Sequence, residues 1–308
     1  MKVWVAHEHG VGLMGGLPDG VTVEIVTGPD RLPSDPAGVS FWVPPFLAQG
    51  GTVRLAEKLP DLKVVQLLSA GADAWVGRLP AGVTLCDARG VHDSSTAEWT
   101  VTAILSYLRA FPPFIRAQAR GEWAYADFTP TDELAGKRVL IVGAGSIGAA
   151  LAARLAPFEV ELTRVARTPR PDEGVHGVAD LPALLPTADV VVVIVPLTDQ
   201  TRGLIDAGFL AALPDGALLV NAARGPVADT AALVAELSTG RIGAALDVTD
   251  PEPLPAGHPL WTLPNVLITP HVAGSVKGVL PRAYRLAGAQ LRRFAAGEPL
   301  VNQVADGY

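Results

Sequence analysis

Short apolar runs recur along the chain, separated by turn residues and helical patterns. In the first third they occupy residues 3–6, 21–26, 39–43, 64–68 and 83–86. From residue 134 onward they occupy residues 138–142, 160–165, 189–195, 217–221, 243–247 and 266–269. Apolar strands that alternate with helices are typical of a parallel sheet covered on both faces. The pattern therefore predicts an α/β protein with two doubly wound sheets.

Helical patterns fall between and after these two sets of strands. Residues 53–59 form an amphipathic segment, and residues 96–111 form a mostly apolar helix that Pro112 and Pro113 should end. The N-cap of this helix is expected among Ser94, Ser95 and Thr96. Because its apolar positions exceed one stripe, we expect it to be buried, and either to join the domains or to form part of a dimer contact.

A further helical pattern resumes after Gly274 and runs to about residue 296, and the chain from residue 300 reads as an extended tail. We expect this helix to return to the first set of strands. The first domain is then discontinuous and comprises residues 1–96 and 275–308. The second domain, of residues 97–274, is inserted into it.

A glycine-rich turn stands at the centre of the second domain. Residues 137–148 read KRVLIVGAGSIG, an apolar strand that ends in Gly-x-Gly-x-x-Gly and is followed by a helical pattern. The first glycine permits a tight turn, the second lets the backbone approach phosphates, and the third lets the helix pack against the strand. Glycine turns also occur without a ligand, but this strand–turn–helix context favours a dinucleotide site. The residues expected at the pyrophosphate are Gly143, Gly145, Ser146, Ile147 and Gly148.

The end of the next strand indicates which dinucleotide is preferred. An NAD site usually has an acidic residue there, about 20 residues after the first glycine. Here Ala166 occupies that place, and Arg167, Thr168 and Arg170 follow. A carboxylate would repel a 2′-phosphate, whereas a guanidinium binds one. We therefore expect NADP(H) to be preferred and NAD(H) to remain possible; the alternative is two solvated arginines in a loop.

Composition excludes several classes of protein. Of the 308 residues, 49% are hydrophobic and 18% charged, and the net charge of −7 argues against nucleic acid as the main partner. The one cysteine, Cys86, excludes a disulfide framework and suits a reducing compartment. The chain starts with a strand-like run and contains no apolar run long enough to span a bilayer. We expect a cytoplasmic protein without a membrane or metal site.

Three functional side chains follow three successive strands of the second domain. Arg224 comes after the run at 217–221, Glu252 after the run at 243–247, and His271 after the run at 266–269. Open α/β sheets bind ligands at the carboxyl ends of their strands. Each residue alone has a structural alternative: a surface charge, a solvated turn residue or a strand-end histidine. Their joint occurrence after a dinucleotide fingerprint favours an active site.

These features together resemble the D-isomer-specific 2-hydroxyacid dehydrogenases, and the resemblance covers nearly the whole chain. The motifs that carry it are SAGAD at 69–73, AE at 97–98, GAGSIG at 143–148, VPLTDQTR at 195–202, NAARG at 221–225, DVTDPEP at 247–253 and TPHVAG at 269–274. Within the family, WVPP at 42–45 and HPLW at 258–261 are most similar to glyoxylate/hydroxypyruvate reductases. The resemblance implies a Rossmann-type dinucleotide domain inserted into a flavodoxin-like substrate domain, and we expect a homodimer.

The resemblance also implies roles, several of which have a physical basis. Arg224 would hold the carboxylate and carbonyl of a 2-oxo acid, and His271 would supply the proton, because histidine changes charge near neutral pH. Glu252 would hydrogen-bond the other ring nitrogen of this histidine. Ala70 and Gly71 would bind the substrate carboxylate, and Trp42 would either wall the substrate pocket or belong to the core. Residues expected along the cofactor are Pro196, Thr201, Ala222, Asp247, His271 and Gly274.

The function expected from these residues is an NADPH-dependent reductase of a small 2-oxo acid, such as glyoxylate or hydroxypyruvate, that gives the D-2-hydroxy acid. The alternative oxidoreductases are an NAD-dependent D-2-hydroxyacid dehydrogenase of the phosphoglycerate kind and a phosphite dehydrogenase. Formate dehydrogenases resemble this fold but have Gln where Glu252 stands. A dinucleotide-sensing protein without turnover is the alternative from another class.

The segment before the AE motif departs from the family pattern. It is usually more apolar, but here it contains His92 and Asp93. These side chains would either contact substrate or form turns and a helix cap, and the structural role is favoured. The identity of the substrate stays open at this point.

Overall fold

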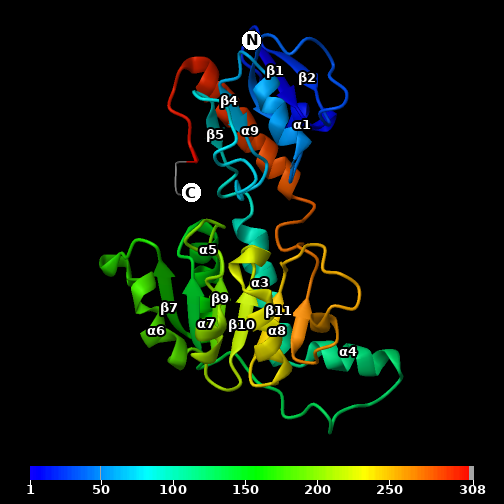
Figure 1. The fold of residues 1–308 in the computed structure, drawn as a ribbon, viewed down its shortest axis with the longest axis vertical. Helices are drawn as coiled ribbons and strands as arrows, with labels where there is room; N and C mark the ends of the chain where they lie inside the picture. Colours follow the sequence, from blue (N-terminus) through cyan, green and yellow to red (C-terminus); the bar gives the residue numbers. More distant parts are fainter. Residues whose placement is uncertain (49, 305–308) are drawn as a thin grey trace. The chain divides into compact units, whose positions relative to one another are not determined.

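The chain divides into two compact units in the computed structural model, which describes residues 1–48 and 50–304. One unit is formed by residues 1–92 together with the chain from residue 276 onward, and the other by residues 93–275. The boundaries expected from sequence lay after residues 96 and 274, a few residues away. Figure 1 gives the element labels used below.

The first unit contains a parallel five-stranded sheet in the order β2-β1-β3-β4-β5. Its strands are β1 (Lys2–Val5), β2 (Thr22–Ile25), β3 (Val39–Val43), β4 (Val64–Gln66) and β5 (Thr84–Cys86). Each overlaps one of the five predicted apolar runs. This order, with β1 between β2 and β3, is that of a doubly wound fold.

Both faces of this sheet are covered. Val3 and Val5 of β1 face a core formed with α1 (Glu8–Leu13) and α9 (Val279–Ala296), which lie side by side in Figure 1. Trp4, between them, faces a second core formed with α2 (Gly51–Arg54) and the 3-10 helix η1 (Leu55–Lys58). This alternation follows from the two-residue period of a strand. The segment at residues 53–59, predicted as one amphipathic element, is divided between the end of α2 and the 3-10 helix η1.

The second unit contains a parallel seven-stranded sheet in the order β12-β11-β10-β9-β6-β7-β8. Its strands are β6 (Arg138–Val142), β7 (Glu161–Ala166), β8 (Val175–Gly177), β9 (Val190–Val193), β10 (Leu218–Asn221), β11 (Gly243–Leu246) and β12 (Val266–Ile268). Six of them overlap predicted runs. The edge strand β8 was not predicted, because its sequence Val-His-Gly contains one apolar residue.

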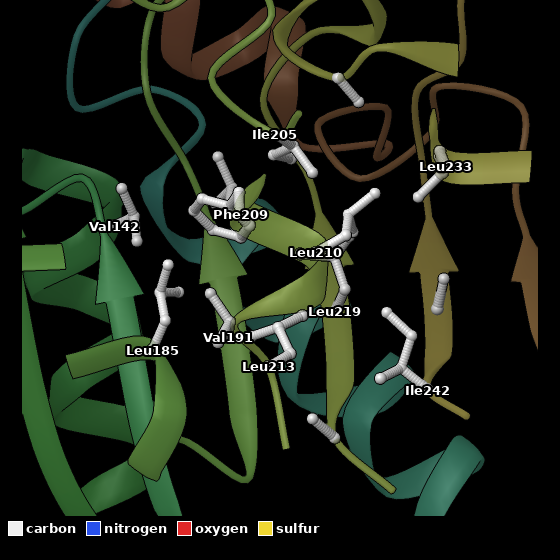
Figure 2. Packing of buried hydrophobic residues seen from close by; sticks show 14 of the residues in the cluster. Val142, Leu185, Val191, Ile205, Phe209, Leu210, Leu213, Leu219, Leu233 and Ile242 are labelled. Atoms are coloured by element: carbon white, nitrogen blue, oxygen red, sulfur yellow. The ribbon is translucent and has the colours of Figure 1, made fainter. Parts of the chain in front are cut away.

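Helices cover both faces of this sheet as well. One face packs against α3 (Asp93–Leu108) and α5 (Ser146–Leu155). The other packs against α6 (Leu181–Leu184), α7 (Ala207–Ala211) and α8 (Thr230–Ser238). Figure 2 shows Phe209, Leu210 and Leu213 lying over Val191 and Leu219 on this second face. The remaining helices are α4 (Phe111–Ala119), η2 (Ala156–Phe158), η3 (Pro171–Glu173), η4 (Val178–Asp180), η5 (Leu185–Thr187), η6 (Gly225–Val227) and η7 (Pro259–Trp261).

The helix predicted at residues 96–111 has different ends in the structure. It begins at Asp93, so the three expected N-cap residues lie inside its first turn, and it ends at Leu108. Ala110 then adopts a left-handed conformation with a φ of 54°. Pro112 and Pro113 do not end this helix but lie in the first turn of α4, where proline removes no intrahelical hydrogen bond.

Two absences hold for the described part of the chain. No helix there is both long enough and apolar enough to cross a bilayer. The same residues contain no group of three or more His, Cys, Asp or Glu side chains placed to hold a metal ion.

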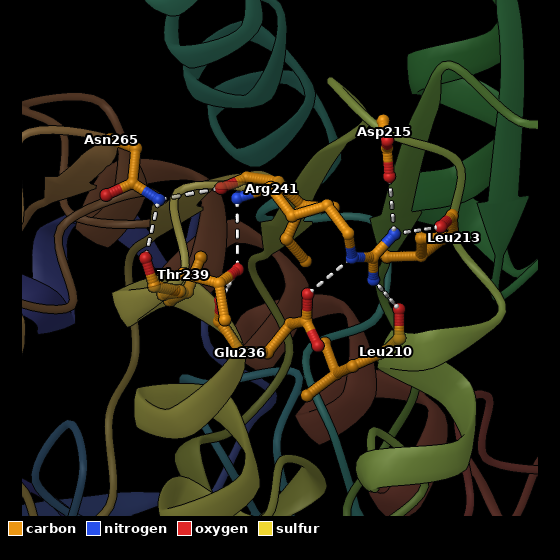
Figure 3. Close-up of polar contacts among 9 residues, drawn as sticks. Leu210, Leu213, Asp215, Glu236, Thr239, Arg241 and Asn265 are labelled. Atoms are coloured by element: carbon orange, nitrogen blue, oxygen red, sulfur yellow. Dashed lines mark hydrogen bonds and ion pairs between the residues drawn. The ribbon is translucent and has the colours of Figure 1, made fainter.

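Arg241 joins three elements of the second unit (Figure 3). Its guanidinium donates to the carbonyl oxygens of Leu210, in the last turn of α7, and of Leu213, just after that helix, and to Glu236 of α8 at 2.7 Å. An ion pair of 3.5 Å with Asp215 completes the set. Pairing with these carboxylates raises the pKa of Arg241 above its ordinary value. The chain is thereby fixed just before β11.

We predict that Arg241→Ala lowers the free energy of unfolding by about 2 kcal/mol, because the helix-end carbonyls lose a charged donor. For a unit of this size the midpoint of thermal unfolding should fall by roughly 4–8 °C in differential scanning calorimetry. The exposed Arg202 gives the matched control, since its replacement by alanine should change stability by less than about 0.5 kcal/mol. An equal effect of the two substitutions would contradict the role of Arg241.

Candidate active site

The three expected catalytic side chains follow three neighbouring strands. Arg224 comes after β10, Glu252 after β11 and His271 after β12, and these strands are adjacent in the sheet. Because the strands are parallel, their carboxyl ends lie at the same end of the sheet. The sheet thus brings residues that are distant in sequence to one side of the second unit.

Close backbone packing joins the first two of these loops. A Cβ atom at Gly225 would lie 1.8 Å from the carbonyl oxygen of Thr249, so only glycine fits directly after Arg224. The buried Asn221 side chain fixes the turn by accepting from the Ala223 amide at 3.0 Å and donating to the Arg224 carbonyl at 3.3 Å. The backbone that carries Arg224 is therefore held against the loop that leads to Glu252.

His271 and Glu252 form a direct pair. His271 Nδ1 lies 2.6 Å from Glu252 Oε1, and their side chains are 26% and 41% exposed. Since a carboxylate accepts, Nδ1 carries the proton in this pair, and Nε2 is the nitrogen left to face a substrate. This arrangement orients the imidazole and provides a negative charge beside it. It suits a histidine that donates and recovers a proton.

Asp247 holds the loop that carries His271. Its buried carboxylate accepts from the hydroxyl of Thr269 at 2.6 Å and from the amides of Val272 and Ala273, each at 2.8 Å. Its carbonyl accepts from the His271 amide at 2.7 Å. His271 itself has a φ of 55°, a left-handed conformation that a side chain other than glycine adopts only when its surroundings hold it there. Sequence reasoning assigned Asp247 to the cofactor and missed this second role, although an acid that ends the apolar run of β11 signals a buried carboxylate.

Arg224 is half-buried at the same end of the sheet. Its side chain donates to the Ala223 carbonyl at 2.8 Å through Nη1. A guanidinium has further donors in one plane, which suits the bidentate recognition of a carboxylate.

The fingerprint glycines fit a dinucleotide. A Cβ at Gly143, whose φ is 122°, would lie 2.1 Å from the Ile194 carbonyl, and one at Gly148 would lie 2.0 Å from the Gly143 carbonyl. The protein's own packing therefore requires these two glycines. Gly145 is exposed, and a Cβ there would meet nothing within 4 Å. The missing side chain at Gly145 leaves open space in front of the N-terminus of α5, which is where a pyrophosphate binds.

The other expected cofactor residues have different surroundings. Ser146 donates its hydroxyl to Asp93 at 3.0 Å, and Thr201 uses its hydroxyl to close a turn onto the Pro196 carbonyl at 2.6 Å. These contacts shape the loops around the expected cofactor. Ala222 and Gly274 are half-buried beside the catalytic loops.

The residues expected at the adenosine end lie at and just after the end of β7. Arg167 and Thr168 are exposed directly after β7. Arg170 donates to Glu173 at 2.8 Å and to the Ala144 carbonyl, within the fingerprint turn, at 2.9 Å. Sequence reasoning missed Glu173, although an acid three residues after an arginine signals an ion pair.

The residues expected to bind substrate in the first unit have contrasting environments. Ala70 and Gly71 are half-buried in the loop after β4, where the Ser69 hydroxyl donates to the Gly71 carbonyl at 2.9 Å. Trp42 is fully buried and packs edge-on against Trp75, with ring centroids 5.5 Å apart. The structure thus places Trp42 in the core, which was the alternative to a pocket wall.

The polar residues that departed from the family pattern also have structural roles. His92 is 6% exposed, donates from Nε2 to the Leu68 carbonyl at 3.1 Å, and lies against the ring of Phe46. Asp93 begins α3. Cys86, at the end of β5, is fully buried, and burial raises the pKa of its thiol to about 12, as expected of a residue that packs in the core.

The chain is similar in sequence and in structure to known proteins of one family. Residues 101–273 match the family model of the D-isomer specific 2-hydroxyacid dehydrogenase, NAD binding domain. A D-isomer specific 2-hydroxyacid dehydrogenase from Xanthobacter autotrophicus, solved with NADPH and MES, is 36% identical over 100% of this chain and 99% of its own, with a TM-score of 0.85.

Two further relatives have named activities. The NADPH-dependent glyoxylate/hydroxypyruvate reductase SmGhrA from Sinorhizobium meliloti, solved with NADP and sulfate, is 29% identical over 100% of this chain and 99% of its own, with a TM-score of 0.85. The chloroplastic/mitochondrial formate dehydrogenase of Arabidopsis thaliana is 34% identical over 82% of this chain and 68% of its own. The chain therefore belongs to the D-isomer-specific 2-hydroxyacid dehydrogenases, which are NAD(P)-dependent oxidoreductases.

Proposed function

We propose that this protein reduces a small 2-oxo acid, such as glyoxylate or hydroxypyruvate, with NADPH to the D-2-hydroxy acid in the cytoplasm. The observation that carries the proposal is the His271–Glu252 pair, 2.6 Å apart, on strand ends next to that of Arg224. Reduction of a carbonyl needs a proton donor, and a 2-oxo acid needs a cation for its carboxylate. The three side chains supply both.

Arg224 orients the substrate. Its guanidinium takes the carboxylate and the neighbouring carbonyl oxygen, which fixes the reacting carbon and draws charge toward that oxygen. The family resemblance implies that backbone N–H groups of Ala70 and Gly71 form the second contact to the carboxylate. When bound, the nicotinamide supplies the hydride that the carbonyl carbon receives.

His271 supplies the proton. As negative charge develops on the carbonyl oxygen, Nε2 of the protonated imidazole donates to it, and Glu252 stabilises the ring through Nδ1. Asp247 keeps this histidine in place by holding its loop, and it contacts the nicotinamide carboxamide as the family resemblance implies. In the oxidation direction the same nitrogen takes the proton back.

The preference for NADPH rests on β7. No carboxylate stands at its end to repel a 2′-phosphate, since Ala166 is the last residue of the strand. Arg167 and Thr168 follow in exposed positions. The relatives solved with NADPH and NADP support this assignment.

Glu252 separates this proposal from its main alternative among oxidoreductases. Formate oxidation releases a hydride and carbon dioxide and needs no proton relay, so a carboxylate beside the histidine has no task there. A sensing role without turnover likewise gives no reason for the complete set of Arg224, Glu252 and His271.

We also propose a homodimer in which a second copy covers the segment around α4. This segment exposes large apolar side chains of the second unit: Phe111 at 56%, Ile115 at 62%, Trp123 at 95% and Tyr125 at 68%. Exposed apolar side chains gathered on one segment are typical of a protein–protein contact.

The decisive experiment is an initial-rate panel of glyoxylate, hydroxypyruvate and other 2-oxo acids with NADPH and with NADH, and of formate and phosphite in the oxidising direction. We expect the highest kcat/KM for a small 2-oxo acid with NADPH. Arg224→Ala serves as the control and should lose kcat/KM by about a thousandfold or more, since a charged contact and the substrate's orientation are lost together. Tight NADPH binding without turnover, or faster formate oxidation, would refute the proposal.

Replacing His271 by alanine should lower kcat by about 10²–10⁴-fold, the usual contribution of a general acid, and leave the Kd of NADPH within a few-fold of wild type. Glu252→Gln should lower kcat by about tenfold or more, because glutamine accepts from Nδ1 but brings no charge. Stopped-flow rates and fluorescence titration of NADPH measure the two quantities. Near-normal turnover in His271→Ala would exclude it as the proton donor.

The homodimer can be tested by light scattering after size-exclusion chromatography. The wild type should have about twice the mass of the 32.0 kDa chain. Trp123→Asp should shift this mass toward the monomer, because a charge would be buried in the contact. Asp127→Asn, a charge change in the same segment, should leave the mass unchanged. A monomeric wild type would disprove the proposal.

A further inference from the structure

The chain after α9 lies against the open edge of the five-stranded sheet. Strand β5 is the last strand on that side of the sheet. Its Cys86 forms an antiparallel bridge with Gln303, and the amide of Asp87 donates to the Asn302 carbonyl at 3.0 Å. The tail of residues 300–304 thus gives β5 a short antiparallel partner and covers its edge.

Asn302 binds the loop after β5 with two of its groups. Besides the carbonyl that accepts from Asp87, its side-chain Nδ2 donates to the Arg89 carbonyl at 3.0 Å. Its φ of 54° lies in the left-handed region, which asparagine adopts more readily than most residues with a side chain. The backbone on both sides of Ala88 is therefore bound to the tail.

The loop after β5 is in turn bonded to the loop after β4. The amide of Ala88 donates to the Ser69 carbonyl at 2.9 Å, and the Ser69 hydroxyl donates to the Gly71 carbonyl at 2.9 Å. The family resemblance implies that the amides of Ala70 and Gly71 bind the substrate carboxylate. A short run of hydrogen bonds therefore joins Asn302 to the backbone expected at the substrate.

Two buried glutamines attach the tail to the same strand ends. Gln290 of α9 donates to the Val301 carbonyl at 2.7 Å and accepts from the Val301 amide at 3.0 Å. It also donates at 3.0 Å to Gln66, the last residue of β4, which donates to the Asp87 carbonyl at 2.9 Å. Both glutamines are fully buried, so a lost bond would leave a polar atom away from water.

We propose that Asn302 and Gln290 are positioning residues, which act through the loop after β5 to set the backbone of Ala70 and Gly71 for the substrate carboxylate. This inference rests on the proposed function and deepens it. Both residues belong to the first unit, as the carboxylate loop does, whereas the dinucleotide fingerprint belongs to the second. Their loss should therefore weaken the binding of the 2-oxo acid and leave the binding of NADPH unchanged.

Asn302→Gly tests the proposal, because glycine keeps the left-handed backbone and its carbonyl bond but loses the Nδ2 donor. The KM of the 2-oxo acid should rise about two- to tenfold, the factor that one hydrogen bond gives, with kcat within about twofold of wild type. The Kd of oxamate, an unreactive isostere of a 2-oxo acid, should rise by the same factor on the complex with NADPH. The Kd of NADPH itself should not change.

Two control variants separate positioning from stability. Gln303→Ala changes the same segment, where the side chain donates to the Leu300 carbonyl at 3.1 Å within the tail, and it should leave KM as in the wild type. Asn265→Ala removes bonds in the second unit, to the Leu237 and Ile242 carbonyls at 2.9 and 2.7 Å. It should lower the midpoint of thermal unfolding and leave KM unchanged.

Gln290→Leu should raise KM and the oxamate Kd at least as much as Asn302→Gly, because the bonds to Val301 and to Gln66 are lost together. Amide hydrogen exchange, followed by mass spectrometry, distinguishes this effect from a folding defect. In both variants we expect faster exchange in residues 67–71 and wild-type rates in residues 138–148 of the second unit.

An unchanged KM and oxamate Kd in Asn302→Gly, or a lower kcat with KM unchanged, would overturn the inference. An equal rise of KM in Asn265→Ala would also overturn it, since the effect would then follow stability alone. Failure of the proposed function has a different sign, because the wild type itself would not reduce 2-oxo acids. The hydrogen-exchange comparison of the variants would still show whether the tail holds residues 67–71.

Discussion

The position of His271 depends on the hydrogen bonds that the buried carboxylate of Asp247 accepts. It binds the loop of His271 through a hydroxyl and two amides, and the adjoining carbonyl binds the histidine's own amide. Without these bonds the left-handed backbone at His271 would relax, and the imidazole would leave Glu252. The hydrogen bonds that hold His271 in place thus come from Asp247, which takes no part in the proton transfer itself.

The three fingerprint glycines show that one motif can satisfy two different demands. Gly143 and Gly148 are required by the protein's packing, since side chains there would collide with backbone atoms. Gly145 meets no such obstacle, so its small size serves what lies outside the chain.

Sequence reasoning recovered the strands and both sheets because buried parallel strands are continuous apolar runs, as in β6 and β9. It missed β8, whose Val-His-Gly sequence carries no such signal. It also placed the ends of α3 wrongly, because packing against α5 extends that helix through three serine and threonine residues that would otherwise cap it. Trp42 could not be assigned from sequence, since core and pocket tryptophans have the same apolar neighbours; its burial required the three-dimensional fold.

The insertion of one unit into the other has a consequence for the order in which the chain folds during synthesis. The seven-stranded unit is complete once residue 275 has left the ribosome. The five-stranded sheet, made first, still lacks α9, whose Tyr284 and Leu291 fill its core. Its apolar face therefore stays exposed to solvent while about 180 intervening residues are synthesised, at roughly 5–20 residues per second. The earliest-made part of this protein is thus the last to mature, and the interval is one in which a chaperone would find exposed apolar surface.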